Sequence, residues 1–216
     1  MKTQSFDLFP VHVKVFDFED DPELNGALLR AAQSDPELSK STTGKSVLQR
    51  TDAWVERLRA RFDVALRGYL TDVHPDRRDP FDIEAYAFFN YTTGSSFTPV
   101  HDHLVEADLV AIYYALAPVR EEQHDTSYYA MDEGLLVLHD PRADARVDRR
   151  NLSTRDHFRI HPRANRLVVH PASLRHSVTP SLGFERLAVT CTVTVDRKDL
   201  FDGYVRYALP PRLERP

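Results

Sequence analysis

The spacing of hydrophobic residues changes character near residue 80. Before that point, apolar residues recur every three or four positions in two segments, 22–33 and 52–70, which predicts two amphipathic helices. A short alternating segment at 10–18 predicts a strand, and the polar, turn-rich segment 34–46 predicts a surface loop. We therefore expect residues 1–80 to form a cap of helices with one short strand.

After residue 80 the pattern becomes one of short strands separated by turn clusters. The strand-like segments are rich in β-branched and aromatic residues, and they span 81–91, 107–116, 134–140, 157–161, 165–170 and 186–195. No helix-length pattern interrupts them, so a parallel sheet with crossover helices is disfavoured. The sequence predicts a mainly β protein with N-terminal helices, arranged as a sandwich or jelly roll.

Size and composition are consistent with one domain. The chain has 216 residues and 24.8 kDa, with 42% hydrophobic and 28% charged residues, and all-β domains of this length commonly form a single unit. We expect one domain over 1–216, with the cap at 1–80, the β core at 81–200 and a C-terminal tail at 201–216. The longest irregular insert, 118–133, fits a lid or binding loop and a solvated excursion equally well.

Charge and cysteine content narrow the function classes. The net charge is −5 and no long run of like charges occurs, which argues against nucleic-acid and membrane-surface binding. No apolar stretch has the length of a signal peptide or a membrane span. The single Cys191 lies on the apolar face of the last predicted strand and excludes an intrachain disulfide, so a cytoplasmic location is expected. Nothing in the sequence indicates an oligomeric state.

Ten histidines are the unusual feature of the composition, and two of them form an HxH pair. In an extended segment, His101 and His103 would point to the same face and Asp102 to the other. Two imidazoles on one face are half of a metal site, although two solvated loop histidines would give the same pattern. A third ligand is needed to distinguish these interpretations.

The last predicted strand offers a second constraint. His176 ends a strand-like stretch, and Arg186 begins the final strand ten positions later. By alternation, Arg186 shares a face with small and hydroxylated residues, namely Ala188, Thr190, Thr192 and Thr194. This polar face either meets solvent or lines a pocket between two sheets, and the residues alone leave both possibilities open.

Together these motifs resemble the iron(II)- and 2-oxoglutarate-dependent oxygenases, and within them an uncharacterised bacterial group. The resemblance rests on the HxH pair, the distal His176, Arg186 ten positions later, and the DPR triplet that ends at Arg142. It extends over most of the chain, including the segments NYTTGSSFTPVHDH and LVVHPASLRHSVTPSLGFERLAV. It implies a double-stranded β-helix, a cupin-like jelly roll that encloses a metal at one open end.

The resemblance implies an oxidoreductase, a dioxygenase that hydroxylates a small-molecule or peptide substrate. Its metal would be Fe(II), bound by His101, His103 and His176, with open positions for 2-oxoglutarate and dioxygen. Arg186 would bind the distal carboxylate of 2-oxoglutarate, since a planar guanidinium suits that group. Further expected contacts to this cosubstrate are Tyr113, Asn90 and Thr190, and Arg142 is a candidate substrate contact. By alternation only one of Tyr113 and Tyr114 can face the pocket, and we expect Tyr113.

Two positions depart from the family pattern. Members of the superfamily have a carboxylate where this chain has His103, so Asp102, Glu106 or Asp108 is an alternative third ligand through a bulge or shifted register. Many relatives have Ser or Thr two residues after the arginine, where this chain has Ala188.

These departures leave other functions open. One is a metal-binding jelly roll that acts as a sensor, and imidazoles would suit zinc there as well as iron. Another is a three-histidine dioxygenase that does not use 2-oxoglutarate.

Overall fold

A computed structural model of the chain describes residues 11–39, 45–117, 134–141, 157–181, 183–196 and 207–210. The helices are α1 (Pro22–Ser34), α2 (Ala53–Val73) and two short 3₁₀ turns, η1 (Pro36–Ser39) and η2 (Val47–Gln49). Helix α1 begins where expected, because the Asp21 side chain accepts a hydrogen bond of 3.0 Å from the Leu24 amide and Pro22 needs no such acceptor. Neither α1 nor α2 combines the length and apolar character needed to cross a membrane.

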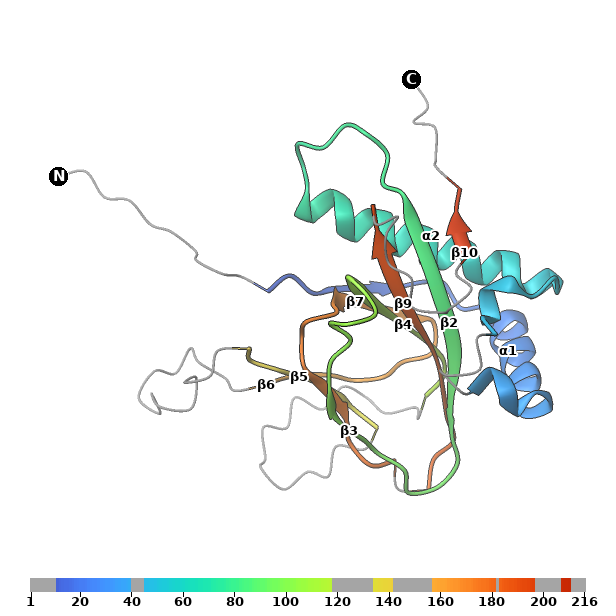
Figure 1. Cartoon of the computed structure of the whole chain (residues 1–216). Coiled ribbons are helices and arrows are strands. Elements are labelled where there is room, and N and C mark those ends of the chain that lie inside the picture. The colour runs from blue at the N-terminus through green and yellow to red at the C-terminus, as the bar shows by residue number, and fades with distance from the viewer. Residues whose placement is uncertain are drawn as a thin grey trace, which may run out of the picture.

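The strands form two antiparallel sheets (Figure 1). The six-stranded sheet has the order β1-β7-β4-β9-β2-β10, made of β1 (Lys14–Asp17), β7 (Arg166–Pro171), β4 (Leu109–Leu116), β9 (Arg186–Val195), β2 (Ile83–Thr92) and β10 (Tyr207–Leu209). The four-stranded sheet has the order β3-β8-β5-β6, made of β3 (Thr98–His101), β8 (His176–Val178), β5 (Leu136–His139) and β6 (His157–Ile160). The expected mainly β jelly roll with N-terminal helices is confirmed.

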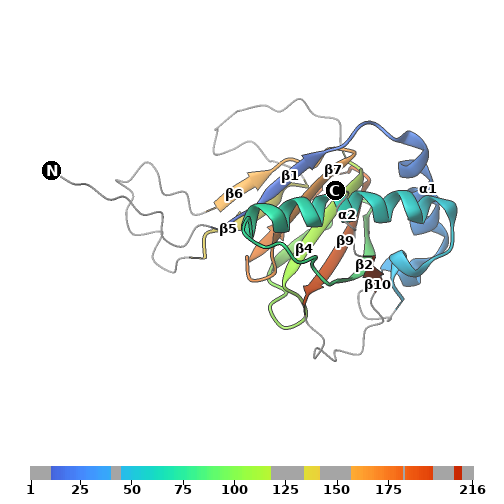
Figure 2. The ribbon, with the colours of Figure 1, turned by 90° about the horizontal axis from the view of Figure 1, so that it is seen from above.

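The six-stranded sheet has a different neighbour on each face. Helices α1 and α2 cover one face (Figures 1 and 2), and the larger apolar core fills that interface with Phe62, Phe89, Leu187 and Cys191 among its members. The other face packs against the four-stranded sheet through a smaller core that includes Tyr114 and Ala188. Each central strand is thus buried on both sides, in agreement with its long apolar runs.

The ends of the described chain are more closely joined to the core than the pattern predicts. Strand β1, from the expected cap, pairs with β7, and β10, from the expected tail, pairs with β2. Both are edge strands of three or four residues, too short for a distinctive periodicity. Strand β3 was not expected as a separate element and is equally short. The division at residues 80 and 200 therefore describes the sequence pattern better than the packing.

Candidate metal centre

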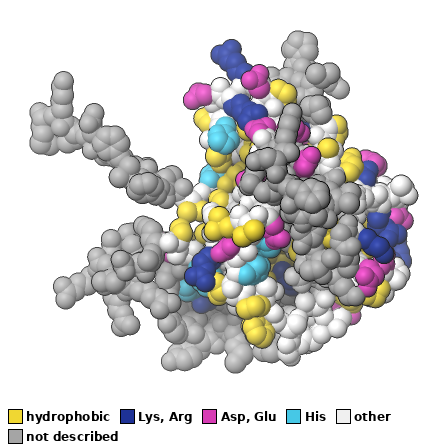
Figure 3. All heavy atoms as spheres, viewed as in Figure 1, with side chains coloured by type: hydrophobic (Ala, Val, Ile, Leu, Met, Phe, Trp, Pro, Cys, Tyr) yellow, Lys and Arg dark blue, Asp and Glu magenta, His cyan; other side chains and the backbone are white. Residues whose placement is uncertain are grey.

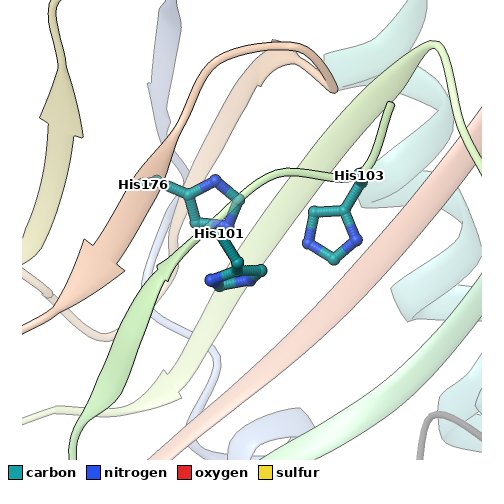
Figure 4. Close-up of side chains that lie close together, drawn as sticks. All are labelled: His101, His103 and His176. Atoms are coloured by element: carbon teal, nitrogen blue, oxygen red, sulfur yellow. The ribbon is translucent and has the colours of Figure 1, made fainter. Parts of the chain in front are cut away.

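Three histidines converge at one end of the four-stranded sheet (Figure 4). His101 ends β3 and His176 begins β8, and the two are direct partners in the antiparallel register. His103 lies two residues beyond β3, where its amide donates to the carbonyl of Ala172 at 2.9 Å. One ring nitrogen from each histidine lies within 4.8 Å of the others. The expected trio is therefore brought together in space.

Hydrogen bonds fix the orientation of all three rings. The Nδ1 of His101 lies 2.9 Å from the Pro99 carbonyl oxygen, and that of His176 lies 3.0 Å from the Leu174 carbonyl oxygen. The Nδ1 of His103 bonds to the Glu106 carboxylate. A carbonyl or carboxylate can only accept, so each Nδ1 carries a proton and Nε2 is the nitrogen left to bind a metal. This is the tautomer that a metal site requires.

Burial disfavours protonation of His176, the most buried histidine of the cluster. Burial and, to a smaller extent, the neighbouring His170 lower the pKa of His176 to about 3. The Nε2 of His103 is buried without a hydrogen-bond partner among the described residues. A buried lone pair without a partner is costly, and a bound metal ion would remove that cost. The donor set therefore fits a metal that accepts imidazole ligands, such as iron(II) or zinc.

The alternative carboxylate ligands have other partners in the structure. The Glu106 carboxylate bonds to Nδ1 of His103. The two residues belong to one turn, in which the Glu106 amide donates to the His103 carbonyl at 3.1 Å. Asp108 accepts from the Val195 amide at 2.9 Å, and Asp102 accepts from the Leu104 amide at 3.4 Å. None of these three carboxylates belongs to the cluster, so the structure favours three imidazoles.

Arg186 lies between the two sheets, on the same side of the six-stranded sheet as Tyr114 and Ala188. It begins β9, is only 2% exposed, and holds its guanidinium carbon 5.3 Å from the centre of the Tyr114 ring. Its Nε is buried, and no described residue accepts a hydrogen bond from it. A buried donor without an acceptor is costly. The arrangement is suited to an anionic ligand such as a carboxylate.

The residues around Arg186 form a row across three strands. Asn90 on β2 and Tyr114 on β4 both pair directly with Ala188 on β9, one from each side. Thr190 follows two positions along the same face and is 8% exposed. The predicted polar face of the last strand thus points to the interior between the sheets and not to solvent. Asn90 and Thr190 lie on this face, as expected.

Tyr113 does not face this interior, and that expectation is wrong. Tyr113 is directed to the helices, where its hydroxyl accepts from Arg61 at 2.5 Å and lies 2.8 Å from Asn25 Oδ1 and 3.0 Å from Asn165 Oδ1. The alternation of β4 is the physical reason, because Ala111 and Tyr113 share the helix-facing side. Tyr114 is therefore the tyrosine that lies beside Arg186.

One further histidine lies against the cluster. His170 is fully buried, with its ring 4.8 Å from that of His176. Burial lowers the pKa of His170 to about 4. No motif spacing distinguished it in the sequence. Arg142 and the insert 118–133 lie outside the described residues.

Comparison with known proteins identifies relatives by structure only. No protein-family model matches the chain, and no curated protein matches it significantly. A prolyl-4-hydroxylase from Pseudomonas putida has a TM-score of 0.55 and 16% identity, over 83% of this chain and 86% of that chain. HygX from Streptomyces hygroscopicus, with nickel and 2-oxoglutarate bound, has a TM-score of 0.53 and 10% identity, over 85% of this chain and 81% of that chain.

A third similar structure comes from a virus. The collagen prolyl hydroxylase vCPH from Paramecium Bursaria Chlorella virus-1 has a TM-score of 0.51 and 11% identity, over 89% of this chain and 98% of that chain. These structural similarities extend over most of both chains in each case, and at such low sequence identities they show the fold alone. The chain therefore has the jelly-roll fold of the 2-oxoglutarate- and iron(II)-dependent oxygenases.

Proposed function

We propose that the protein is an iron(II)- and 2-oxoglutarate-dependent oxygenase that hydroxylates a small-molecule or peptide substrate. The observation that carries this proposal is a pair of features in one interior. Three imidazoles whose Nδ1 atoms are held by hydrogen bonds end the small sheet and leave Nε2 for a metal. The buried Arg186 lies on the face of the large sheet that packs against the small one. A cation site and an anion site enclosed by the same two sheets are what iron and 2-oxoglutarate together require.

In this proposal each residue has a defined task. His101, His103 and His176 hold Fe(II), and Glu106 keeps the His103 ring in its binding orientation. Arg186 binds the distal carboxylate of 2-oxoglutarate through its planar donor pair, with Asn90, Tyr114 and Thr190 as nearby polar contacts. When bound, iron and 2-oxoglutarate activate dioxygen, transferring one oxygen atom to the substrate and the other to succinate, with release of carbon dioxide.

The substrate is expected to bring an apolar group to the metal centre. Exposed apolar side chains flank the two histidines of the HxH pair: Phe97 is 66% exposed, Val100 46%, Leu104 58% and Val105 90%. Figure 3 shows hydrophobic side chains beside histidine side chains on the viewed face. Apolar surface next to a reactive centre is typical of a binding site. The net charge of −5 argues against a nucleic-acid substrate, and the single cysteine fits a cytoplasmic location.

Replacement of Arg186 by Met tests the proposal. We expect the Arg186→Met protein to bind Mn(II) as the wild type does and to lose at least about tenfold in 2-oxoglutarate affinity, because hydrogen bonds to a charged group contribute about 1.5–3 kcal/mol. Arg186→Lys keeps the charge without the planar fork and should give an intermediate affinity. Titration calorimetry measures the Mn(II) affinity with metal-free protein and the 2-oxoglutarate affinity with Mn(II)-loaded protein.

Two results would contradict the assignment. If the wild-type protein reconstituted with Fe(II) neither binds 2-oxoglutarate nor releases succinate in air, the oxygenase function is wrong. If it binds metal but Arg186→Met leaves 2-oxoglutarate binding unchanged, Arg186 is not the cosubstrate contact. Metal binding without any 2-oxoglutarate binding would instead support a metal-dependent sensor, and oxygen consumption without 2-oxoglutarate would support a three-histidine dioxygenase.

A further inference from the structure

A fourth histidine, His170, lies against the metal centre without belonging to the ligand cluster. It is on β7, opposite Val110 of β4, and its side chain is fully buried. Its ring is 4.8 Å from that of His176 and meets it at 63°. The cluster whose nitrogens can share one ion contains only His101, His103 and His176 among the described residues. His170 therefore contacts the centre from a second layer.

The protonation pattern of His170 follows from its one hydrogen bond. Its Nδ1 lies 2.8 Å from the carbonyl oxygen of Pro171, which can only accept, so Nδ1 carries the proton. Complete burial disfavours the doubly protonated, charged ring. The Nε2 is therefore an acceptor, and it is buried with no partner among the described residues. Such an acceptor is costly unless a donor reaches it.

No described residue supplies that donor. The Nδ1 atoms of His101, His103 and His176 face Pro99, Glu106 and Leu174, and their Nε2 atoms are the ones left to bind a metal. A molecule that enters the centre can supply the donor. A water molecule bound to a metal ion is a strong donor, because the cation withdraws electron density from its O–H bonds.

We propose that His170 is a positioning residue whose Nε2 accepts a hydrogen bond from a water molecule bound at the metal centre. This inference rests on the proposed function, because it assumes that the three-histidine cluster binds a metal. It assigns His170 neither to the ligand set nor to the apolar core. Its role is to hold one exchangeable ligand in a fixed direction before cosubstrate and substrate enter.

Two variants separate the two nitrogens of His170. In His170→Asn the amide can still donate to Pro171 but nothing occupies the Nε2 position, whereas the longer His170→Gln brings an amide oxygen towards that position. We expect both variants to lose less than about 100-fold in Co(II) affinity, because neither removes a ligand. The visible d–d spectrum of Co(II) should change in His170→Asn, because the coordinated water is no longer held, and return towards wild type in His170→Gln.

The wild-type protein allows a test that needs no variant. In a long-range ¹H–¹⁵N spectrum of the zinc-loaded protein, His170 should show a protonated Nδ1 and an Nε2 with the shift of a hydrogen-bond acceptor. A protonated Nε2 would overturn the proposal.

The remaining outcomes are also decisive. An unchanged Co(II) spectrum in His170→Asn would mean that His170 only packs. A loss of about 100-fold or more in Co(II) affinity would make it a ligand, which also contradicts the proposal. If wild-type protein binds no Co(II), the proposed function fails with it, whereas binding without any effect of the variants overturns only the role of His170.

Discussion

The hydrogen bond between Glu106 and His103 is the residue-level feature that most directly affects metal binding. The carboxylate accepts from Nδ1 and so orients the ring and raises the basicity of Nε2. Removing the negative charge by Glu106→Gln should weaken metal affinity by about 10–100-fold. Titration of the metal-free protein with Co(II) or Mn(II) measures this change.

A matched control is available at Asp102, four residues before Glu106. Asp102 carries the same charge and lies next to both histidines of the pair, but it bonds the Leu104 amide and not an imidazole. Asp102→Asn removes one negative charge at nearly the same place, so it should change metal affinity by about threefold or less. Equal losses in Glu106→Gln and Asp102→Asn would indicate that local charge, and not ring orientation, governs binding.

Sequence spacing was sufficient for the three histidines but not for the residues that support them. An HxH pair and a distal histidine restrict the choice, because strand alternation puts His101 and His103 on one side wherever the segment is extended. The contact of Glu106 depends on a turn that closes on the His103 carbonyl. The contact of His170 with His176 depends on how β7 of one sheet is placed relative to β8 of the other sheet, which no local pattern encodes.

At the scale of elements, β4 separates structural from ligand-binding functions through two adjacent tyrosines. Tyr113 links α1, α2 and the turn before β7 through Asn25, Arg61 and Asn165, whereas Tyr114 lies beside Arg186. Tyr113→Phe should therefore lower the free energy of unfolding by about 1–3 kcal/mol, because buried polar partners lose a hydrogen bond. Denaturation by urea measures this loss, and 2-oxoglutarate affinity should not change.

The neighbouring variant should show the opposite behaviour. Tyr114→Phe removes a buried hydroxyl next to the proposed carboxylate site, so it should weaken 2-oxoglutarate binding by about 3–10-fold while changing stability less than Tyr113→Phe does. Calorimetric titration with 2-oxoglutarate checks this. If Tyr113→Phe reduces 2-oxoglutarate affinity more than Tyr114→Phe does, the assignment of the two faces of β4 is wrong.

The two faces of β4 could not be distinguished from the sequence because both are buried. Its residues Leu109 to Ala115 are all buried, so the usual contrast between an apolar and a polar face is absent. In β9 the contrast exists, since hydroxyls alternate with aliphatic side chains. Its residues were divided correctly between two faces, but the sequence left open whether the polar face met solvent or a pocket. Packing on two sides removes the signal that alternation normally supplies.

For the whole molecule, the change of pattern at residue 80 predicted the architecture because helices and strands occupy separate parts of the sequence. The helices could then only cover one face of a sheet, which leaves the other face for a second sheet. The hydrophobic pattern could not predict which strands pair. Strand β1, for example, pairs with β7 and so joins residues 14–17 to residues 166–169, far away in the sequence. The consequence is that the metal centre and the helix interface lie on opposite sides of one sheet.

The burial of His170 and His176 makes the stability of the metal-free protein depend on pH. Burial holds the pKa of His170 at about 4 and that of His176 at about 3, below the ordinary value of 6.5. Between these values and 6.5, the unfolded chain binds protons that the folded chain excludes, so acid favours unfolding. Full stability is present above about pH 6.5, and it falls as the pH decreases towards 4.

We therefore expect the unfolding free energy of the metal-free protein to fall between pH 6.5 and 4.5 with a slope of up to about 1.4 kcal/mol per pH unit for each of these two histidines. Urea denaturation in the presence of a chelator at several pH values measures this slope. His170→Gln removes one titrating group and should reduce the slope. Because metal binding requires neutral imidazoles, saturating Co(II) should raise stability most at neutral pH and progressively less in acid. A slope that is the same in wild type and in His170→Gln would show that His170 does not resist protonation in the folded protein.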